Sequence, residues 1–170
     1  MRRSWLYLLL VPGLALGSQI VKRTLTERAR MADRVVLAQV LSSRVVAENG
    51  NPRALMTMTD VIVGEHLKGQ GPERLTILQR GGALGLWEVH IPGDARLING
   101  ETALLLLKCP EPAVCVLTAL GEAKVGIQGA DALLFDMATQ QVTRRPLAQV
   151  KSEIRAAVAA PAVAPKAVAK

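Results

Sequence analysis

The feature that most constrains the fold is a pair of apolar segments joined by a short loop with a cysteine at each end. Residues 104–107 are four consecutive leucines, and residues 114–120 form a second, mostly apolar segment. Between them, Cys109 and Cys115 enclose five residues that include two prolines. Apolar runs separated by turn residues are typical of paired antiparallel strands, and cysteines on facing strands can be bridged. Residues 101–128 therefore predict a central β-hairpin closed by a Cys109–Cys115 disulfide.

The first 17 residues have the pattern of a secretory signal peptide. Two arginines precede an apolar stretch over residues 5–17, which is shorter than the roughly 20 residues that a membrane-spanning helix needs. Small residues at Ala15 and Gly17 predict cleavage before Ser18. We therefore expect an exported protein, periplasmic or secreted, with no stable membrane span after cleavage, in a compartment where disulfides persist. The alternative is that this segment is kept as an anchor.

The rest of the chain divides into a lead-in, a β domain, a helix and a tail. Residues 18–33 form the lead-in, in which Thr24 and Glu27 have the spacing of a capping box and predict a helix over residues 25–32. Pro146 and an apolar stripe predict a helix over residues 146–159, and the Ala/Pro/Lys-rich residues 160–170 predict a disordered end. Alternating and apolar runs predict strands over residues 35–47, 53–63, 75–79, 86–91, 122–128, 132–135 and 141–144.

These strands are short and are separated by Gly- and Pro-containing turns, such as the Asn49–Gly50 turn. There is no βαβ alternation, which disfavours a parallel α/β sheet. Since only 2% of residues are aromatic, the core must be aliphatic. The pattern predicts a mainly β fold, a single small antiparallel (OB-like) barrel over residues 34–145 with a helix at each end. Asp60 shares a strand face with apolar residues, which predicts a bulge or a barrel rim at that position.

The order of four short motifs resembles known proteins. They are the segment from Ala32 to Val40 (ADRVVLAQV), the segment from Val61 to Gly69 (VIVGEHLKG), Pro92-Gly93, and Gly100-Glu101 ahead of the leucine run. Over residues 30–128 this order resembles small secreted bacterial proteins of unknown function and the netrin-like, or tissue-inhibitor-of-metalloproteinase-like, OB barrel. The resemblance implies the fold. The inhibitors of that family begin with a metal-chelating cysteine, and this chain has no cysteine before Cys109.

Residue patterns for catalysis or metal binding are weak. Two cysteines and two histidines are the right number for zinc, but His66 and His90 are isolated, and neither has the spacing of a zinc motif. Glu65 and Glu88 lie near these histidines, where a carboxylate and an imidazole can act as acid and base. No serine lies in a Gly-x-Ser-x-Gly elbow. We therefore predict no enzyme activity, no metal and no cofactor.

The composition also bears on partners. The net charge of +7 is spread without a long run of like charges. Only Trp87 and Phe135 remain as aromatic residues beyond the signal peptide, too few to stack on single-stranded nucleic acid. Trp87 follows a glycine-rich corner, and we predict a contact surface formed by Trp87, Gly81, Gly82, Gly85 and His90. The alternative is that Trp87 fills the barrel interior.

Together these patterns predict an exported, non-enzymatic β-barrel module that binds an unknown protein or cell-envelope component. Nucleic acid is not an expected partner. A protease-inhibitor-like secreted protein is one alternative, and it would act through a loop at the barrel rim. A hydrolase with an unrecognised site is the other, and it would need a pocket that joins His66 or His90 to a carboxylate.

Overall fold

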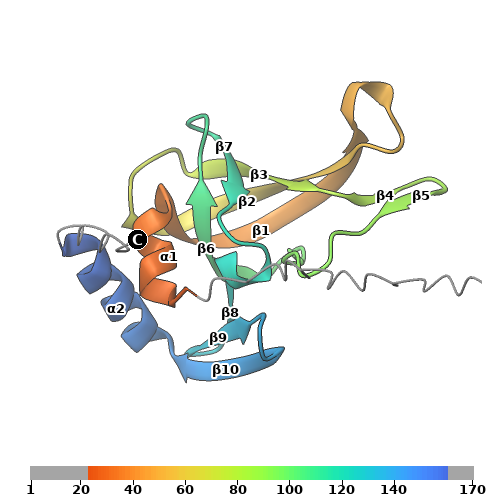
Figure 1. Ribbon diagram of the computed structural model, residues 1–170. Coiled ribbons are helices and arrows are strands. Elements are labelled where there is room, and N and C mark those ends of the chain that lie inside the picture. The colour runs from red at the N-terminus through yellow and green to blue at the C-terminus, as the bar shows by residue number, and fades with distance from the viewer. Residues whose placement is uncertain (1–22, 161–170) are drawn as a thin grey trace, which may run out of the picture.

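The computed structural model describes residues 23–160 of the 170-residue chain. The predicted signal peptide and residues 161–170 of the predicted tail lie outside that range. Strands make up most of the regular structure, and an α-helix lies at each end of the described part (Figure 1). In chain order the elements are α1 (Leu25–Met31), β1 (Arg34–Ala47), η1 (Glu48–Gly50), β2 (Leu55–Lys68), β3 (Arg74–Arg80), β4 (Gly82–Leu84), β5 (Trp87–Val89), β6 (Thr102–Lys108), β7 (Val114–Leu117), η2 (Gly121–Ala123), β8 (Lys124–Gln128), β9 (Asp131–Asp136), β10 (Gln141–Pro146) and α2 (Leu147–Ala159).

Eight strands form one mixed sheet in the order β1-β2-β3-β7-β6-β8-β9-β10, and β4 and β5 form a separate two-stranded sheet. β1 also pairs with β6. The chain of neighbouring strands therefore closes on itself in the order β1, β2, β3, β7, β6 and back to β1. A ring of five strands cannot alternate direction throughout, so one neighbouring pair must be parallel. That pair is β3 and β7, which align residues 76–78 with residues 114–116. The prediction of a purely antiparallel sheet is wrong at this contact.

Most predicted elements form close to where the sequence places them, but two differ. β2 continues past Gly64 to Lys68, because this part of the strand still pairs with β1, where Val35 lies opposite Lys68. The predicted strand over residues 86–91 is shortened to Trp87–Val89, and it pairs with β4 outside the main sheet. Glycine weakens a strand, but the pairing with β1 on one side keeps β2 extended past Gly64, where β3 no longer pairs with it.

The leucine run is explained by the position of β6 between two cores. Leu104 and Leu106 face a core that includes residues of both α-helices, whereas Leu105 and Leu107 face a core built from β1, β2, β3 and β7. All four side chains are fully buried. Neighbouring side chains of a strand point to opposite faces, so a strand covered on both faces is apolar at every position.

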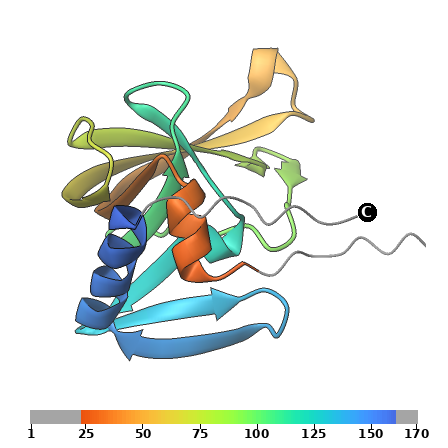
Figure 2. The ribbon, with the colours of Figure 1, turned by 60° about the vertical axis from the view of Figure 1, so that its left-hand side comes forward.

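The two α-helices lie side by side against the sheet (Figures 1 and 2). α1 begins with the predicted capping box, in which Thr24 Oγ1 accepts a hydrogen bond from the Glu27 N–H and the Glu27 carboxylate accepts one from the Thr24 N–H. α2 buries Val150 and Ile154, as its predicted apolar stripe requires. Segments from both ends of the described chain therefore complete the same core.

Candidate functional site

The disulfide predicted from the sequence is present. Cys109 and Cys115 are bonded, with a Cα–Cα distance of 4.0 Å, and Cys115 is fully buried. Asp33, just before β1, accepts hydrogen bonds from Lys108 Nζ at 2.7 Å and from the Cys109 N–H at 3.0 Å. Both hydrogen bonds lower the pKa of Asp33 below its usual value, and the bond from Lys108 has the larger effect. The disulfide thus fixes the turn between β6 and β7, and Asp33 ties this turn to the start of β1.

The predicted contact residue Trp87 lies on a hairpin that projects from the main sheet (Figure 1). This β4–β5 hairpin, residues 82–89, turns at Gly85, whose φ is +62°. Its exposed apolar side chains are Leu84 at 42%, Leu86 at 103% and Trp87 at 47% of full exposure. Trp87 therefore does not fill the sheet interior, and the two leucines extend the exposed apolar surface around it.

Three contacts fix the base and one side of this hairpin to the β1–β2 pair. The Gly81 N–H donates to the Leu55 carbonyl at 2.7 Å, and Thr57 Oγ1 donates to the Gly81 carbonyl at 2.8 Å. The Arg53 guanidinium lies 6.0 Å from the centre of the Trp87 ring, within range of a cation–π interaction. These contacts attach the hairpin base to β2 and the Trp87 ring to the turn between β1 and β2.

Gly82 is required at the hairpin base for reasons of space as well as conformation. Its φ is +125°, a region that side chains disfavour. A Cβ at this position would lie 2.6 Å from Thr57 Oγ1 and 2.8 Å from a methyl carbon of Val45. The glycine-rich corner noted in the sequence is thus a close approach of β4 to β1 and β2.

Beneath the hairpin lies a groove of about 610 Å³, called here the hairpin groove. Strands β1, β2 and β3 form one side of it, and the hairpin together with residues 90–97 forms the other. The groove brings together three residues of the predicted contact surface, Gly81, Gly82 and His90. The other two, Gly85 and Trp87, lie on the hairpin outside the groove lining.

The groove floor is polar, which the sequence reasoning missed. Thr59 is fully buried, and its hydroxyl is 2.9 Å from that of Ser43. Gln79 Nε2 donates to the Ala95 carbonyl at 2.7 Å. The alternation of Thr57 and Thr59 with other residues of β2 was the available signal, but it does not show which face a neighbouring element covers. The polar groups of the floor are bonded to one another and to nearby backbone, and these bonds connect β1, β2 and β3 with the segments that form the other side of the groove.

The rim of the groove carries charges of both signs. Arg80 and Arg96 line it together with Glu88 and Asp94, and His90 lies beside them. Within residues 23–160, no hydrogen bond or ion pair joins Glu88 to His90. The groove rim therefore has no patch of a single charge sign.

The other histidine of the sequence analysis lies elsewhere. His66 is on β2, and its Nδ1 is buried without a hydrogen-bond partner. Its neighbour Glu65 accepts hydrogen bonds from Lys151 and Arg155 of α2 instead, so this carboxylate attaches the helix to the sheet. The described part of the chain holds no cluster of three or more His, Cys, Asp or Glu side chains suited to a metal ion.

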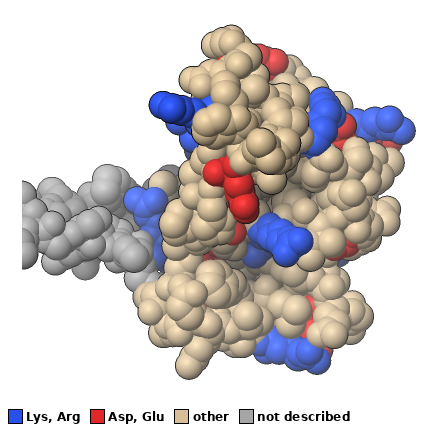
Figure 3. Space-filling model, turned by 90° about the vertical axis from the view of Figure 1, so that its right-hand side faces the viewer, with Lys and Arg blue, Asp and Glu red and all other residues tan. Residues whose placement is uncertain are grey.

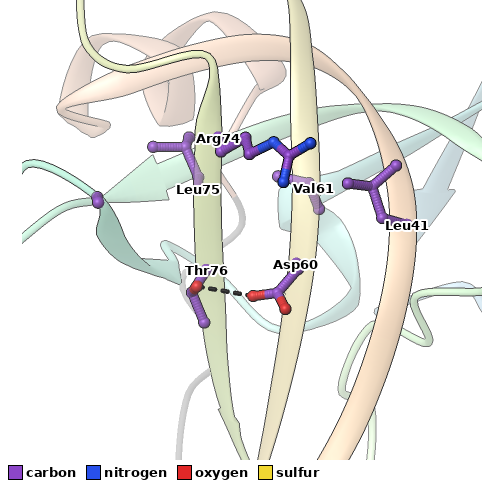
Figure 4. Close-up of a pocket in the computed structure, with 7 residues that line it drawn as sticks. Leu41, Asp60, Val61, Arg74, Leu75 and Thr76 are labelled. Carbon is purple, nitrogen blue, oxygen red and sulfur yellow. Dashed lines mark hydrogen bonds between the residues drawn. The ribbon is translucent and has the colours of Figure 1, made fainter.

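A second cavity of about 380 Å³ opens on β1, β2 and β3 (Figure 4). Asp60 Oδ1 accepts a hydrogen bond from Thr76 Oγ1 at 2.8 Å, and Oδ2 accepts one from Arg44 at 2.8 Å. These partners, Thr76 foremost, lower the pKa of Asp60. The pairing of β1 with β2 shifts register at Leu41, so an irregularity lies opposite Asp60 in β1, whereas β2 itself pairs regularly with β3 through Asp60. The Asp60 carboxylate is already bonded to the neighbouring Thr76 and Arg44 side chains.

The end of the molecule that carries the hairpin has charges of both signs and no large patch of either sign. Figure 3 presents this end with scattered Lys, Arg, Asp and Glu side chains on a mainly uncharged surface. Over residues 23–160, no helix has the length and apolar character needed to cross a bilayer. Comparison with known proteins finds no matching family model, curated protein or solved structure. The function is therefore inferred from the geometry of the hairpin and its groove.

Proposed function

We propose that this protein is an exported binding module that contacts a protein or cell-envelope component through the β4–β5 hairpin. The observation that carries the proposal is the group of exposed apolar side chains, Leu84, Leu86 and Trp87, on a hairpin fixed at its base. Grouped exposed apolar side chains mark interaction sites. A surface held in place before binding loses less conformational entropy when it binds.

We further propose that β1, β2, β3, β7 and β6 form an OB-like barrel. The support is the ring of pairings and its single parallel contact between β3 and β7. OB barrels bind ligands on the face of their second and third strands and on adjoining loops. The hairpin groove lies against β2 and β3, and the Arg53 contact joins the hairpin to the β1–β2 turn. The candidate site thus lies where such a barrel would bind.

Export is part of the proposal. The intramolecular disulfide is compatible with an oxidising compartment, and the charged and apolar pattern of the first 17 residues supports secretion. Expression of the full chain, followed by N-terminal sequencing of the exported product, should give Ser18 as the first residue. A product that begins at Met1 in the membrane fraction would show an anchored protein instead.

A binding role rather than catalysis fits the groove. Glu88 and His90 share it without a bond between them, and the Ser43 hydroxyl is paired with Thr59. A nucleophile activated by a base needs the two groups within hydrogen-bond reach. We therefore propose a non-enzymatic module.

The test is site-specific photo-crosslinking in cells that make the full chain. A photoreactive amino acid replaces Leu86 in one variant and Val142 in the control. Val142 is also an exposed apolar residue, at 61%, but it lies on β10. We expect discrete crosslinked products from position 86 and none of these from position 142. Identical products at both positions, or no product at position 86, would contradict a hairpin-mediated contact.

A protease inhibitor is the second candidate, and one specific observation favours it. Leu86 is fully exposed on a projecting, fixed hairpin, a geometry in which one side chain can enter the specificity pocket of a protease. The exported product should then inhibit at least one protease of a broad panel at equimolar concentration, and Leu86→Asp should abolish the effect. No inhibition across the panel would remove this candidate.

A further inference from the structure

β1 is paired along both sides for only part of its length. On the side of β6, the pairing runs from Arg34 to Gln39, and the last backbone bonds join Val40 to the 100–101 segment at 2.8 and 2.9 Å. The chain turns away from β1 at Gly100, whose φ is +84°. β1 itself continues to Ala47, paired with β2 alone. Residues 41–47 therefore form a free β1 edge in the described structure.

This edge borders the hairpin groove. Beyond β6, β1 continues beside β2 alone, while β2 is still paired with β3 as far as Met56 and Arg80; this part of the sheet lies beside the hairpin (Figure 1). Ser43 and Val45 of the free β1 edge line the groove, and Arg96 and Leu97, which precede β6 in the chain, line it as well. Alternate side chains of a strand point to the same face. A strand added beside residues 41–47 would therefore direct every second side chain into the groove.

We propose that an extended segment of a partner protein adds to the free β1 edge and places alternate side chains in the hairpin groove. The inference rests on the proposed binding function and names the chemistry of the partner. An open strand edge presents a row of backbone N–H and C=O groups, and an extended peptide backbone is the group that matches such a row. Backbone bonds supply affinity in strand addition, while side-chain pockets supply specificity. The polar floor and mixed charges of the groove provide those pockets.

The charge pattern favours a partner segment over a second copy of this chain. Arg44 is the single charged residue of the free β1 edge, and its guanidinium bonds Asp60 of β2 at 2.8 Å, so it is engaged within the sheet. In an antiparallel pairing of two copies centred on this position, Arg44 would face Arg44 of the other copy. Like charges directly opposite each other destabilise a strand pair.

The outer edge of β10 is less suited to an added strand. It ends at Pro146, which has no N–H to donate. Arg144 reaches Gln128 at 2.6 Å, and Arg145 bonds Glu153 of α2. These arginines bond β10 to β8 and to α2. The β10 edge can therefore serve as a control for strand addition at the free β1 edge in the same protein.

The test uses a displayed library of random decapeptides, selected against the exported product of the full chain. Amide hydrogen exchange of the product with a selected peptide should slow at residues 41–47. Only every second amide of an added strand faces its neighbour. Methylation of the peptide amides in one alternating set should therefore weaken binding at least tenfold, whereas methylation in the other set should change it by less than threefold.

Two matched lysine variants test whether the selected peptide binds at the free β1 edge. Val46→Lys places a lysine on the free β1 edge, where charge discourages strand addition, and should weaken the selected peptide several-fold. Val142→Lys makes the same change on β10 and should leave binding unchanged. Hydrogen exchange of both variants without peptide checks that each is folded.

Several results would overturn the inference. Enrichment of no peptide over an empty-surface control, or equal effects of both methylation sets, would exclude strand addition. Protection of residues 82–89 without residues 41–47 would refute the edge contact while leaving the hairpin-mediated function intact. Protection of residues 41–47 that rises with protein concentration, without peptide, would identify a second copy as the occupant. Absence of crosslinking at Leu86 would instead count against the proposed function itself.

Discussion

Replacing Cys109 with alanine opens the disulfide while leaving the buried Cys115 side chain in the core. The sequence separation of the two cysteines is 6. In the loop-entropy model, closing a loop this short stabilises the folded state by about 2.2 kcal/mol, because it restricts the unfolded chain. Since Cys115 is fully buried and remains in place, and Cys109 is only partly buried against the same core, Cys109→Ala should cost about that amount. The melting temperature should fall by roughly 5–10 °C.

The assay is urea unfolding of the oxidised protein and of Cys109→Ala, each with and without a thiol reductant. Reductant should destabilise the natural protein by the same amount as the substitution, and it should leave the variant unchanged. The hydrogen bond from the Cys109 N–H to Asp33 does not need the sulfur atom, so it survives the change. A variant as stable as the oxidised protein, or a variant that reductant destabilises further, would refute the reasoning.

Three further predictions concern the helix, the hairpin base and pH. Ile154→Ala removes a fully buried side chain of α2 and should cost about 2–5 kcal/mol in urea unfolding, whereas the exposed Ser152→Ala should cost less than about 0.5 kcal/mol. Gly82→Ala creates a short contact at the hairpin base and should speed limited proteolysis within residues 82–89, whereas Gly85→Ala, which meets open space, should do so much less. The pKa of Asp33 in the folded state lies below its usual 3.8. Its contribution to the free energy of unfolding is therefore present above that pH and is lost as the pH falls through the folded-state pKa. Asp33→Asn should make the loss of stability below about pH 4 less steep, and an unchanged slope would contradict this.

Local patterns explain what the sequence predicted well. The spacing of Cys109 and Cys115 and the apolar runs on either side specify the hairpin and its bridge within a short segment. Thr24 and Glu27 specify the start of α1 in the same way. These elements depend on neighbours a few residues away, so the sequence contains most of the information that defines them.

The features that the sequence did not predict depend on segments far apart in the chain. The parallel contact of β3 with β7 follows from the return of β6 to β1, which no local pattern reveals. β4 has only three residues, too few for an alternating pattern, so the sequence predicts only a glycine-rich corner there. β5 lies within the predicted strand over residues 86–91, but its pairing with β4 is not predicted. Thr59 is buried by elements that pack over β2, so its place in the groove floor could not be read from β2 alone.

The joint packing of α1 and α2 has a consequence for the order of events during biosynthesis. Leu25 and Ala29 of α1 share their core with Val150 and Ile154 of α2, and these segments lie at opposite ends of the described chain. α1 also shares this core with Val35 and Leu67 of the sheet, so it has partners before α2 is made. The core over Leu104 and Leu106 is nevertheless complete only when α2 joins it, and a growing chain that lacks α2 should expose apolar surface on that face of β6.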